Sequence, residues 1–230
     1  MTVPGLAQRA MPLLVLVLLP GCAHQSNEPS PAHVEAPAGQ LAFDDCELSD
    51  GSTVPSDFPR GSLAPAGPTE HAFACALSAD LAALGEPALF PLPPSGEVVR
   101  VLWIRSGRHP VSVRFERQGS AGQVRGAQTA GKGLAIPGEL LEETSNPASA
   151  EQVTTLLTRV QAARLWAPAP RPGEVPPPDA ASIWVFEAAR AGEYRLRVFQ
   201  RETLARDAAF DALARALVAG SGLHVEGGVY

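Results

Sequence analysis

The sequence predicts an α+β fold in which two hairpins form an antiparallel sheet and a helix follows each hairpin. In residues 98–104 and 111–116 the side-chain pattern repeats every two residues, which is typical of strands. Apolar residues then recur at the helical spacing between residues 149 and 166. The same order of patterns returns at residues 183–201 and 207–219, so we expect hairpin, helix, hairpin, helix.

The first hairpin has the clearest strand pattern. Val99, Val101 and Trp103 alternate with residues that are also largely apolar, which is typical of a strand buried on both faces. Residues 111–116 alternate apolar and polar side chains, so one face of the second strand should meet water. A turn is expected at residues 106–110, and a third strand could follow near residues 123–128.

Both helices carry recognisable end signals. Ser149 and Gln152 form a capping box that should start the first helix, which we expect to end near Trp166. A proline-rich stretch follows at residues 167–179. The second helix should run from about residue 207 to 219 and stop at Gly220.

The segment before the first hairpin is loop-rich, and a disulfide is expected to order it. Cys46 and Cys75 are the two cysteines of this segment, and an even pair in an exported protein normally oxidises. A short helix is predicted over residues 78–84, with Ser78 as its N-cap and Gly85 as its stop.

The N-terminus predicts export and lipid anchoring. Residues 13–19 are all apolar, too few to cross a bilayer but sufficient for the core of a signal peptide. Residues 19–22, Leu-Pro-Gly-Cys, resemble the bacterial lipobox, which implies that Cys22 is acylated, with palmitate as the expected chain, after cleavage before it. Ala23 follows where aspartate would favour the inner membrane, so we expect the outer membrane, with the domain facing the periplasm.

These signals define the predicted domain organisation. Residues 1–21 are the signal peptide, and residues 22–40 are a polar tether that cannot form a core. Residues 41–230 form a single α+β domain, with the loop-rich segment at 41–96 and the hairpin and helix core at 97–230.

Charge and motifs exclude several classes of function. The net charge is −6, and removal of Arg9 with the signal peptide makes the chain more acidic still, so nucleic-acid binding is not expected. Residues 126–133 fit a phosphate loop except for Gly133, where serine or threonine should bind magnesium, so no nucleotide or other cofactor is expected. The five histidines show no ligand spacing for a metal, although weak calcium binding at the acidic turn of residues 45–51 stays open.

The strongest candidate for binding is a cluster of cations around the first hairpin. Its members are Arg105, Arg108, His109, Arg114 and Arg117. One interpretation is a face that binds an anionic group or an acidic protein surface. The other is an ordinary solvated strand face whose arginines pair with nearby carboxylates such as Glu116. No catalytic motif is present, but a triad assembled in space around His71 or His109 stays open.

Three short motifs in order resemble a group of exported bacterial proteins that has no assigned activity. They are Leu102-Trp-Ile-Arg105, His109-Pro-Val-Ser-Val-Arg114 and Trp184-Val-Phe-Glu187, the last continuing to Gly192 and Tyr194. The resemblance covers roughly residues 98–220 and implies architecture and export. Arg195 stands where the group often has histidine, so no role of that histidine carries over. Trp184 and Tyr194 would form a cross-strand aromatic pair, and Glu187 could meet an arginine of the first hairpin.

Taken together, these features favour a non-enzymatic protein. We expect a membrane-anchored envelope lipoprotein of unknown biochemical activity that works as a protein-binding or structural module. Its expected partners are the membrane, through the lipid, and an envelope protein. The alternative is a cell-envelope hydrolase with a dispersed site near His109.

Overall fold

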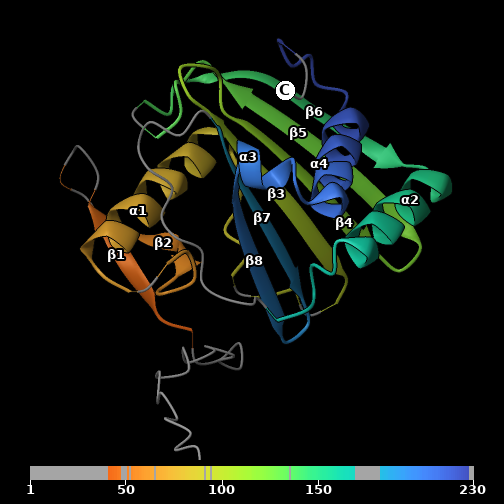
Figure 1. The fold of residues 1–230 in the computed structure, drawn as a ribbon, viewed down its shortest axis with the longest axis horizontal. Coiled ribbons are helices and arrows are strands. Elements are labelled where there is room, and N and C mark those ends of the chain that lie inside the picture. The colour runs from red at the N-terminus through yellow and green to blue at the C-terminus, as the bar shows by residue number, and fades with distance from the viewer. Residues whose placement is uncertain are drawn as a thin grey trace, which may run out of the picture. The chain divides into compact units, whose positions relative to one another are not determined.

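The α+β class is confirmed, with an antiparallel six-stranded sheet as its centre (Figure 1). The computed structural model describes residues 41–47, 51, 53–64, 66–90, 92–93, 95–134, 136–168 and 182–227. All of these residues fall in one compact unit. The predicted signal peptide, Cys22 and the tether lie outside the described residues.

The sheet consists of a four-stranded meander extended by one hairpin. The meander is β3 (Glu97–Arg105), β4 (Val111–Gln118), β5 (Ala121–Thr129) and β6 (Leu140–Ala148). The hairpin is β7 (Ser182–Arg190) and β8 (Glu193–Gln200). The strand order is β6-β5-β4-β3-β7-β8, so β3 pairs with the distant β7 and becomes a central strand.

Helices and a small ribbon complete the domain. The ribbon is β1 (Phe43–Glu47) with β2 (Thr53–Pro59), and it is followed by α1 (Pro68–Ala83). The helices α2 (Ala150–Ala162), α3 (Arg201–Leu204) and α4 (Ala208–Ser221) come after the meander and after the hairpin. The expected N-terminal segment, hairpins and following helices are therefore present, with α3 as an addition.

The strand β6 was not predicted, because its sequence lacks the alternation of apolar residues that is typical of strands. Leu140–Ala148 contains five consecutive polar residues and Pro147, and most of its side chains are exposed. Proline lacks the N–H that a central strand would donate, so it is confined to positions such as an edge. The structure places β6 at the edge, paired on one side with β5, where such a sequence is tolerated.

The helix α1 begins ten residues earlier than predicted. Pro68 occupies its first turn, where the missing N–H is no loss. Ser78 is therefore an interior residue and not an N-cap, and its hydroxyl donates to the carbonyl of Ala74. The predicted stop is confirmed, since Gly85 follows the helix with φ 67°. Residues with a side chain rarely adopt such a positive φ, whereas glycine does so readily.

The two later helices follow their predicted signals with one shift each. The capping box of Ser149 and Gln152 is present in both directions. This helix ends at Ala162, and a turn continues to Trp166. Asp207 caps α4, which continues through the predicted stop Gly220 and ends before Gly222, which has φ 76°.

Side-chain alternation builds a core on each face of the sheet. The first core lies under α2, α3 and α4, and in it Trp103 stacks on Trp184 with ring centroids 4.3 Å apart. The second core joins the opposite face to α1 and β2 through residues such as Leu77, Leu102 and Val185. The central strand β3 is thus covered on both faces, as its apolar pattern predicted. The expectation that one face of β4 meets water is wrong, because Glu86 of the segment after α1 packs against Ser112 and Arg114 on that face.

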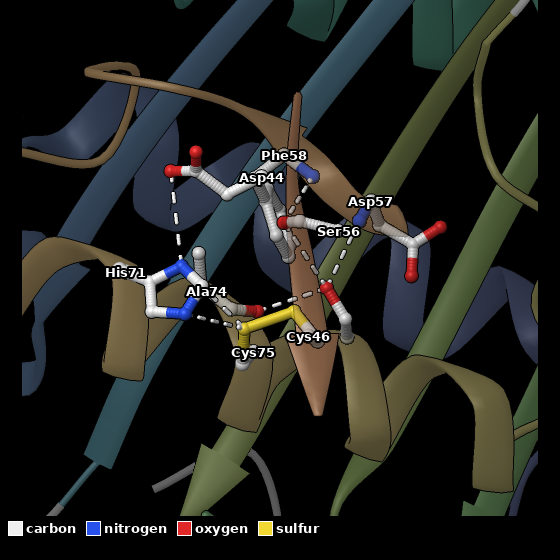
Figure 2. Close-up of a disulfide and its surroundings, with 9 residues drawn as sticks. Asp44, Cys46, Ser56, Asp57, Phe58, His71, Ala74 and Cys75 are labelled. Carbon is white, nitrogen blue, oxygen red and sulfur yellow. Dashed lines mark hydrogen bonds and ion pairs between the residues drawn. A yellow bond between two sulfur atoms is a disulfide. The ribbon is translucent and has the colours of Figure 1, made fainter. Parts of the chain in front are cut away.

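The predicted disulfide is confirmed and ties β1 to α1. Cys46 and Cys75 form the bond, with their Cα atoms 5.4 Å apart (Figure 2). Phe58 of β2 packs in the second core, and the N–H of Asp57 donates to Ser78 Oγ, so the disulfide adds a covalent link to existing contacts with α1. The cross-link therefore supplies order to the N-terminal segment.

We expect removal of this cross-link to lower the free energy of unfolding by roughly 3–4 kcal/mol in a Cys46→Ala, Cys75→Ala variant, because the loop it closes gains entropy in the unfolded chain. Urea unfolding measures the difference. A Cys22→Ala variant serves as the control and should unfold like the unchanged protein. A loss below about 1 kcal/mol would contradict the entropic estimate.

Candidate functional site

The five residues of the predicted cationic face lie at three separate places along the first hairpin. Arg105, Arg108 and His109 are at the turn between β3 and β4. Arg114 lies in mid-strand, and Arg117 lies near the far end of β4. They therefore do not form one continuous binding face.

Of the turn residues, Arg105 is occupied by structural contacts, whereas Arg108 is exposed. Arg105 is 4% exposed and donates to the carbonyls of His109, at 2.9 Å, and Glu226, at 3.0 Å. Its guanidinium also lies 4.8 Å from the ring centroid of Trp103. Burial, with a smaller contribution from Arg108, lowers the pKa of Arg105. Arg105 thus joins the hairpin turn to the C-terminal segment.

His109, the centre of the alternative hydrolase hypothesis, is half-buried beside this turn. Its Nδ1 atom is buried and has no hydrogen-bond partner in the described part of the chain. A catalytic base needs a carboxylate or carbonyl that orients its ring. The hydrolase hypothesis gains no support from this geometry and stays a prediction.

Arg114 belongs to a row of three arginines that crosses the sheet. In the strand register Arg100 of β3 lies opposite Arg114 of β4, and Arg114 lies opposite Arg125 of β5. All three point to the face that α1 and its flanking segments cover. Like charges directly opposite one another on neighbouring strands are destabilising, so this row requires compensation.

Glu86 supplies most of that compensation from the segment after α1. Its side chain is fully buried, and it forms an ion pair with Arg125 and accepts from the hydroxyl of Ser112 at 2.7 Å. Its second oxygen lies 3.6 Å from Arg114 and 3.8 Å from Arg100. One carboxylate therefore touches all three cations. Arg100 Nη1 also donates to the carbonyl of Pro87 at 2.8 Å.

Glu187 of β7 neutralises Arg100 from the other side. Arg100 Nε donates to Glu187 Oε2 at 2.8 Å, and both side chains are fully buried. Arg100 Nη2 is 2.6 Å from the same oxygen but is not aligned as a hydrogen bond, so we treat that contact as ionic. The expectation that Glu187 meets an arginine of the first hairpin is thus confirmed.

Tyr194 also belongs to this charged cluster and not to an aromatic pair with Trp184. Its hydroxyl donates to Glu187 Oε1 at 2.8 Å, whereas Trp184 points to the opposite face and stacks on Trp103. The predicted cross-strand pair is wrong because Tyr194 lies opposite Ala189 in the register. Burial and the adjacent carboxylate of Glu187 raise the pKa of Tyr194 well above its ordinary value.

Two aspartates at this side of the sheet carry raised pKa values. Burial raises the pKa of Asp57 to about 6, although the nearby Arg100 opposes the rise. Burial also raises the pKa of Asp80 to about 6, while the backbone N–H of Leu134, donating to Asp80 Oδ2 at 2.9 Å, opposes the rise. Asp80 thereby fastens the glycine-rich segment to α1, and residues 126–129 of that segment belong to β5.

A groove with a volume of about 370 Å³ lies between the end of α2 and the start of β3, on the face opposite the arginine row. It is lined by Glu97, Leu157, Val160, Gln161, Arg164, Trp166, Ala167 and Arg190. This volume is within the range of ligand-binding pockets. None of its residues had been singled out from the sequence as a site, because they come from three separate segments.

The tryptophan of this groove is held from several directions. Trp166 Nε1 donates to Glu97 Oε1 at 2.9 Å, and the guanidinium of Arg190 lies 4.2 Å from the ring centroid. Arg195 donates to the carbonyl of Trp166 at 3.1 Å, and Arg197 donates to that of Ala167. The groove is therefore preorganised by β3, β7 and β8.

Among the described residues of the groove, one exposed cation has no carboxylate partner. Glu97 pairs with Arg117 at 3.1 Å, and Arg190 forms an ion pair with Glu193. Arg164 is exposed and has no ionic partner among the residues that the structure describes. The arrangement can accept a ligand that combines an apolar body with a negative group.

The comparisons with known proteins add no family. No family model matches the chain, and no curated protein matches it. Among the described residues there is no group of histidine, cysteine, aspartate and glutamate suited to hold a metal ion. No helix in that part of the chain is both long and apolar enough to cross a membrane.

We expect Arg100→Met to lower the free energy of unfolding by about 3–5 kcal/mol, because it leaves Glu187 buried without its cation. A matched change at the exposed Arg206, Arg206→Met, should stay within about 0.5 kcal/mol of the unchanged protein. The double variant Arg100→Met, Glu187→Met should recover part of the loss. Urea unfolding measures all three, and equal effects at Arg100 and Arg206 would contradict the compensation argument.

Asp80 should make the protein less stable as the pH rises. Because its pKa is near 6 in the folded chain and lower when unfolded, the folded state binds the extra proton between about pH 4 and 6. The stabilisation is present below pH 4 and is lost as the pH rises through 6, with a total of about 2–3 kcal/mol. Asp80→Asn should flatten this slope in unfolding experiments at pH 4.5–7.5. An unchanged slope would show that Asp80 does not hold the proton.

Proposed function

We propose that this chain is a lipid-anchored bacterial envelope protein whose domain acts by binding a partner and not by catalysis. The N-terminal pattern supports export, and Cys22 follows it in a lipobox-like context. The chain has three cysteines, and the bond between Cys46 and Cys75 leaves Cys22 available for acylation. In this proposal Ala23 directs the protein to the outer membrane, facing the periplasm.

The observation that carries the binding proposal is the groove beside Trp166. Leu157 and Val160 give it an apolar wall, Trp166 gives it a fixed aromatic side, and Arg164 gives it an exposed positive charge. Aromatic and arginine side chains dominate the energetically important positions of protein interfaces. The proposed occupant is a segment of an envelope protein that places an acidic side chain beside an apolar one.

The location of the other charges supports this choice. The arginine row, which shares only Arg114 with the cationic cluster expected from the sequence, is closed under α1 and neutralised by Glu86 and Glu187. Those cations are already paired and would gain little from an external anion. Arg164 is exposed, and an approaching carboxylate can reach it.

A photo-reactive residue tests the groove in living cells. Placed at Gln161, which lines the groove and is exposed, it should crosslink one defined partner, and Arg164→Glu should reduce that product about tenfold by charge repulsion. The same residue at Leu141, which is 54% exposed on β6, is the matched control and should not capture that partner. Equal crosslinking from both positions would refute the groove as the contact.

The anchor is tested separately by membrane fractionation. A Cys22→Ala variant should be missing from the outer-membrane fraction and keep its signal peptide, because there is no thiol to acylate. A variant that is processed normally and stays with the membrane would refute the lipid anchor. Since the groove test uses the unchanged N-terminus, the two results are independent.

A further inference from the structure

The histidine ring of His71 lies between a carboxylate and the disulfide (Figure 2). His71 Nδ1 is 3.7 Å from Asp44 Oδ2, and both ring nitrogens are 3.9 Å from the Sγ atom of Cys75. His71 and Cys75 lie one turn apart on α1, while Asp44 comes from β1. Two elements that the disulfide itself joins therefore bring an acid, a base and a sulfur together.

Asp44 remains a carboxylate in this arrangement. Arg60 donates to Asp44 Oδ1, and this hydrogen bond is the main cause that lowers the pKa of Asp44, with a smaller contribution from His71. A carboxylate on the Nδ1 side favours the tautomer with its proton on Nδ1. Nε2 is then left with a lone pair close to the sulfur of Cys75.

The two sulfurs of the bond differ in access. Cys46 is 2% exposed, whereas Cys75 is only half-buried, and the side chain of His71 beside it is 42% exposed. A thiol from solution can therefore approach Cys75 from the histidine side and cannot approach Cys46.

Other contacts hold the two cysteines near each other apart from the disulfide. The N–H of Asp57 donates to Ser78 Oγ at 3.0 Å, and the N–H of Gly61 donates to Glu70 Oε1 at 3.2 Å. Both bonds join the segment around β2 to α1. An opened disulfide would leave its sulfurs in position to close again.

We propose that the bond between Cys46 and Cys75 is an exchangeable disulfide at which Cys75 accepts an external thiol, with His71 as the base and Asp44 as the residue that orients it. This site lies outside the proposed groove, and the lipid anchor does not depend on it.

The exchange is balanced without any further reactant. His71 Nε2 takes the proton of the incoming thiol, and the resulting thiolate attacks Cys75 Sγ. The new sulfur–sulfur bond forms as the bond to Cys46 breaks, and its electron pair moves to Cys46 Sγ. The proton is then returned to Cys46, through solvent. The products are a mixed disulfide on Cys75 and a free thiol on Cys46, so the external sulfur is oxidised and Cys46 is reduced.

The test follows mixed-disulfide formation on the full oxidised chain with reduced glutathione at pH 7.5. Acid-quenched samples are weighed by intact mass spectrometry, and peptide mapping separates Cys46 from Cys75 because Arg60 lies between them. We expect one glutathione on Cys75, and a rate about tenfold lower in His71→Asn, since general-base help from histidine is lost. Asp44→Asn should lower the rate less.

His224 provides the matched control. It also contacts a carboxylate, with Nδ1 3.2 Å from Glu142 Oε1, but it is 94% exposed and no contact joins it to the disulfide. His224→Asn should exchange at the unchanged rate. Absence of any adduct on the folded protein, an adduct on Cys46, or a rate in His71→Asn within twofold of the unchanged protein would overturn the proposal.

A pH profile keeps the proposal testable even where a variant folds poorly. In the unchanged protein, mixed-disulfide formation below pH 7.5 should be faster than the fraction of glutathione present as thiolate predicts. The reason is that His71 removes the proton of the glutathione thiol. A rate strictly proportional to that fraction would also overturn it. A parallel series with a cysteine-containing peptide distinguishes the source of the thiol. Faster reaction of the peptide points to a protein thiol, and faster reaction of glutathione points to a small one.

Discussion

The ion pair of Arg100 with Glu187 at the centre of the sheet is the constraint on which the rest of the fold depends. Arg100 is wholly buried and has Arg114 directly opposite it, with Arg125 one strand further. A bare sheet with that row would be strongly unfavourable, so the segment after α1 must deliver Glu86 to it. The N-terminal segment is therefore an integral part of the domain, because the electrostatics of β3, β4 and β5 require it.

This arrangement divides the molecule into a closed face and an accessible one. On the α1 side the charges satisfy one another, with Tyr194 and Ser112 completing the hydrogen bonds of the two buried carboxylates. On the side of α2 the groove keeps an exposed Arg164 beside the fixed ring of Trp166. The buried arginines thus stabilise the fold, whereas the exposed Arg164 is accessible to a binding partner. The hairpin cations drew attention in the sequence because they are numerous, although most of them are already paired.

Local signals in the sequence predicted local structure, whereas most long-range pairings could not be predicted. The capping box of Ser149 and the disulfide of Cys46 could be predicted because each depends on residue type and spacing. The strand β6 could not, since an edge position tolerates a polar sequence that no period identifies. The pair of Arg100 and Glu187 joins residues 87 positions apart. The resemblance indicated that Glu187 could meet an arginine of the first hairpin, but no pattern in the sequence said that this arginine is Arg100. No sequence signal indicated the groove, because its lining comes from separate segments.

The cross-link between β1 and α1 also determines how the domain responds to mechanical force. A pull that enters the domain from its N-terminal side reaches β1 first, and a two-stranded ribbon alone would unzip one hydrogen bond at a time. With Cys46 joined to Cys75, the pull passes beyond residue 46 directly into the middle of α1, whose Leu77 and Leu81 are packed in the second core. The ribbon between the two cysteines is then shielded from the tension. Opening the disulfide would release the chain between Cys46 and the start of α1 at Pro68, so the bond limits how far the N-terminal segment can be extended by force before α1 resists.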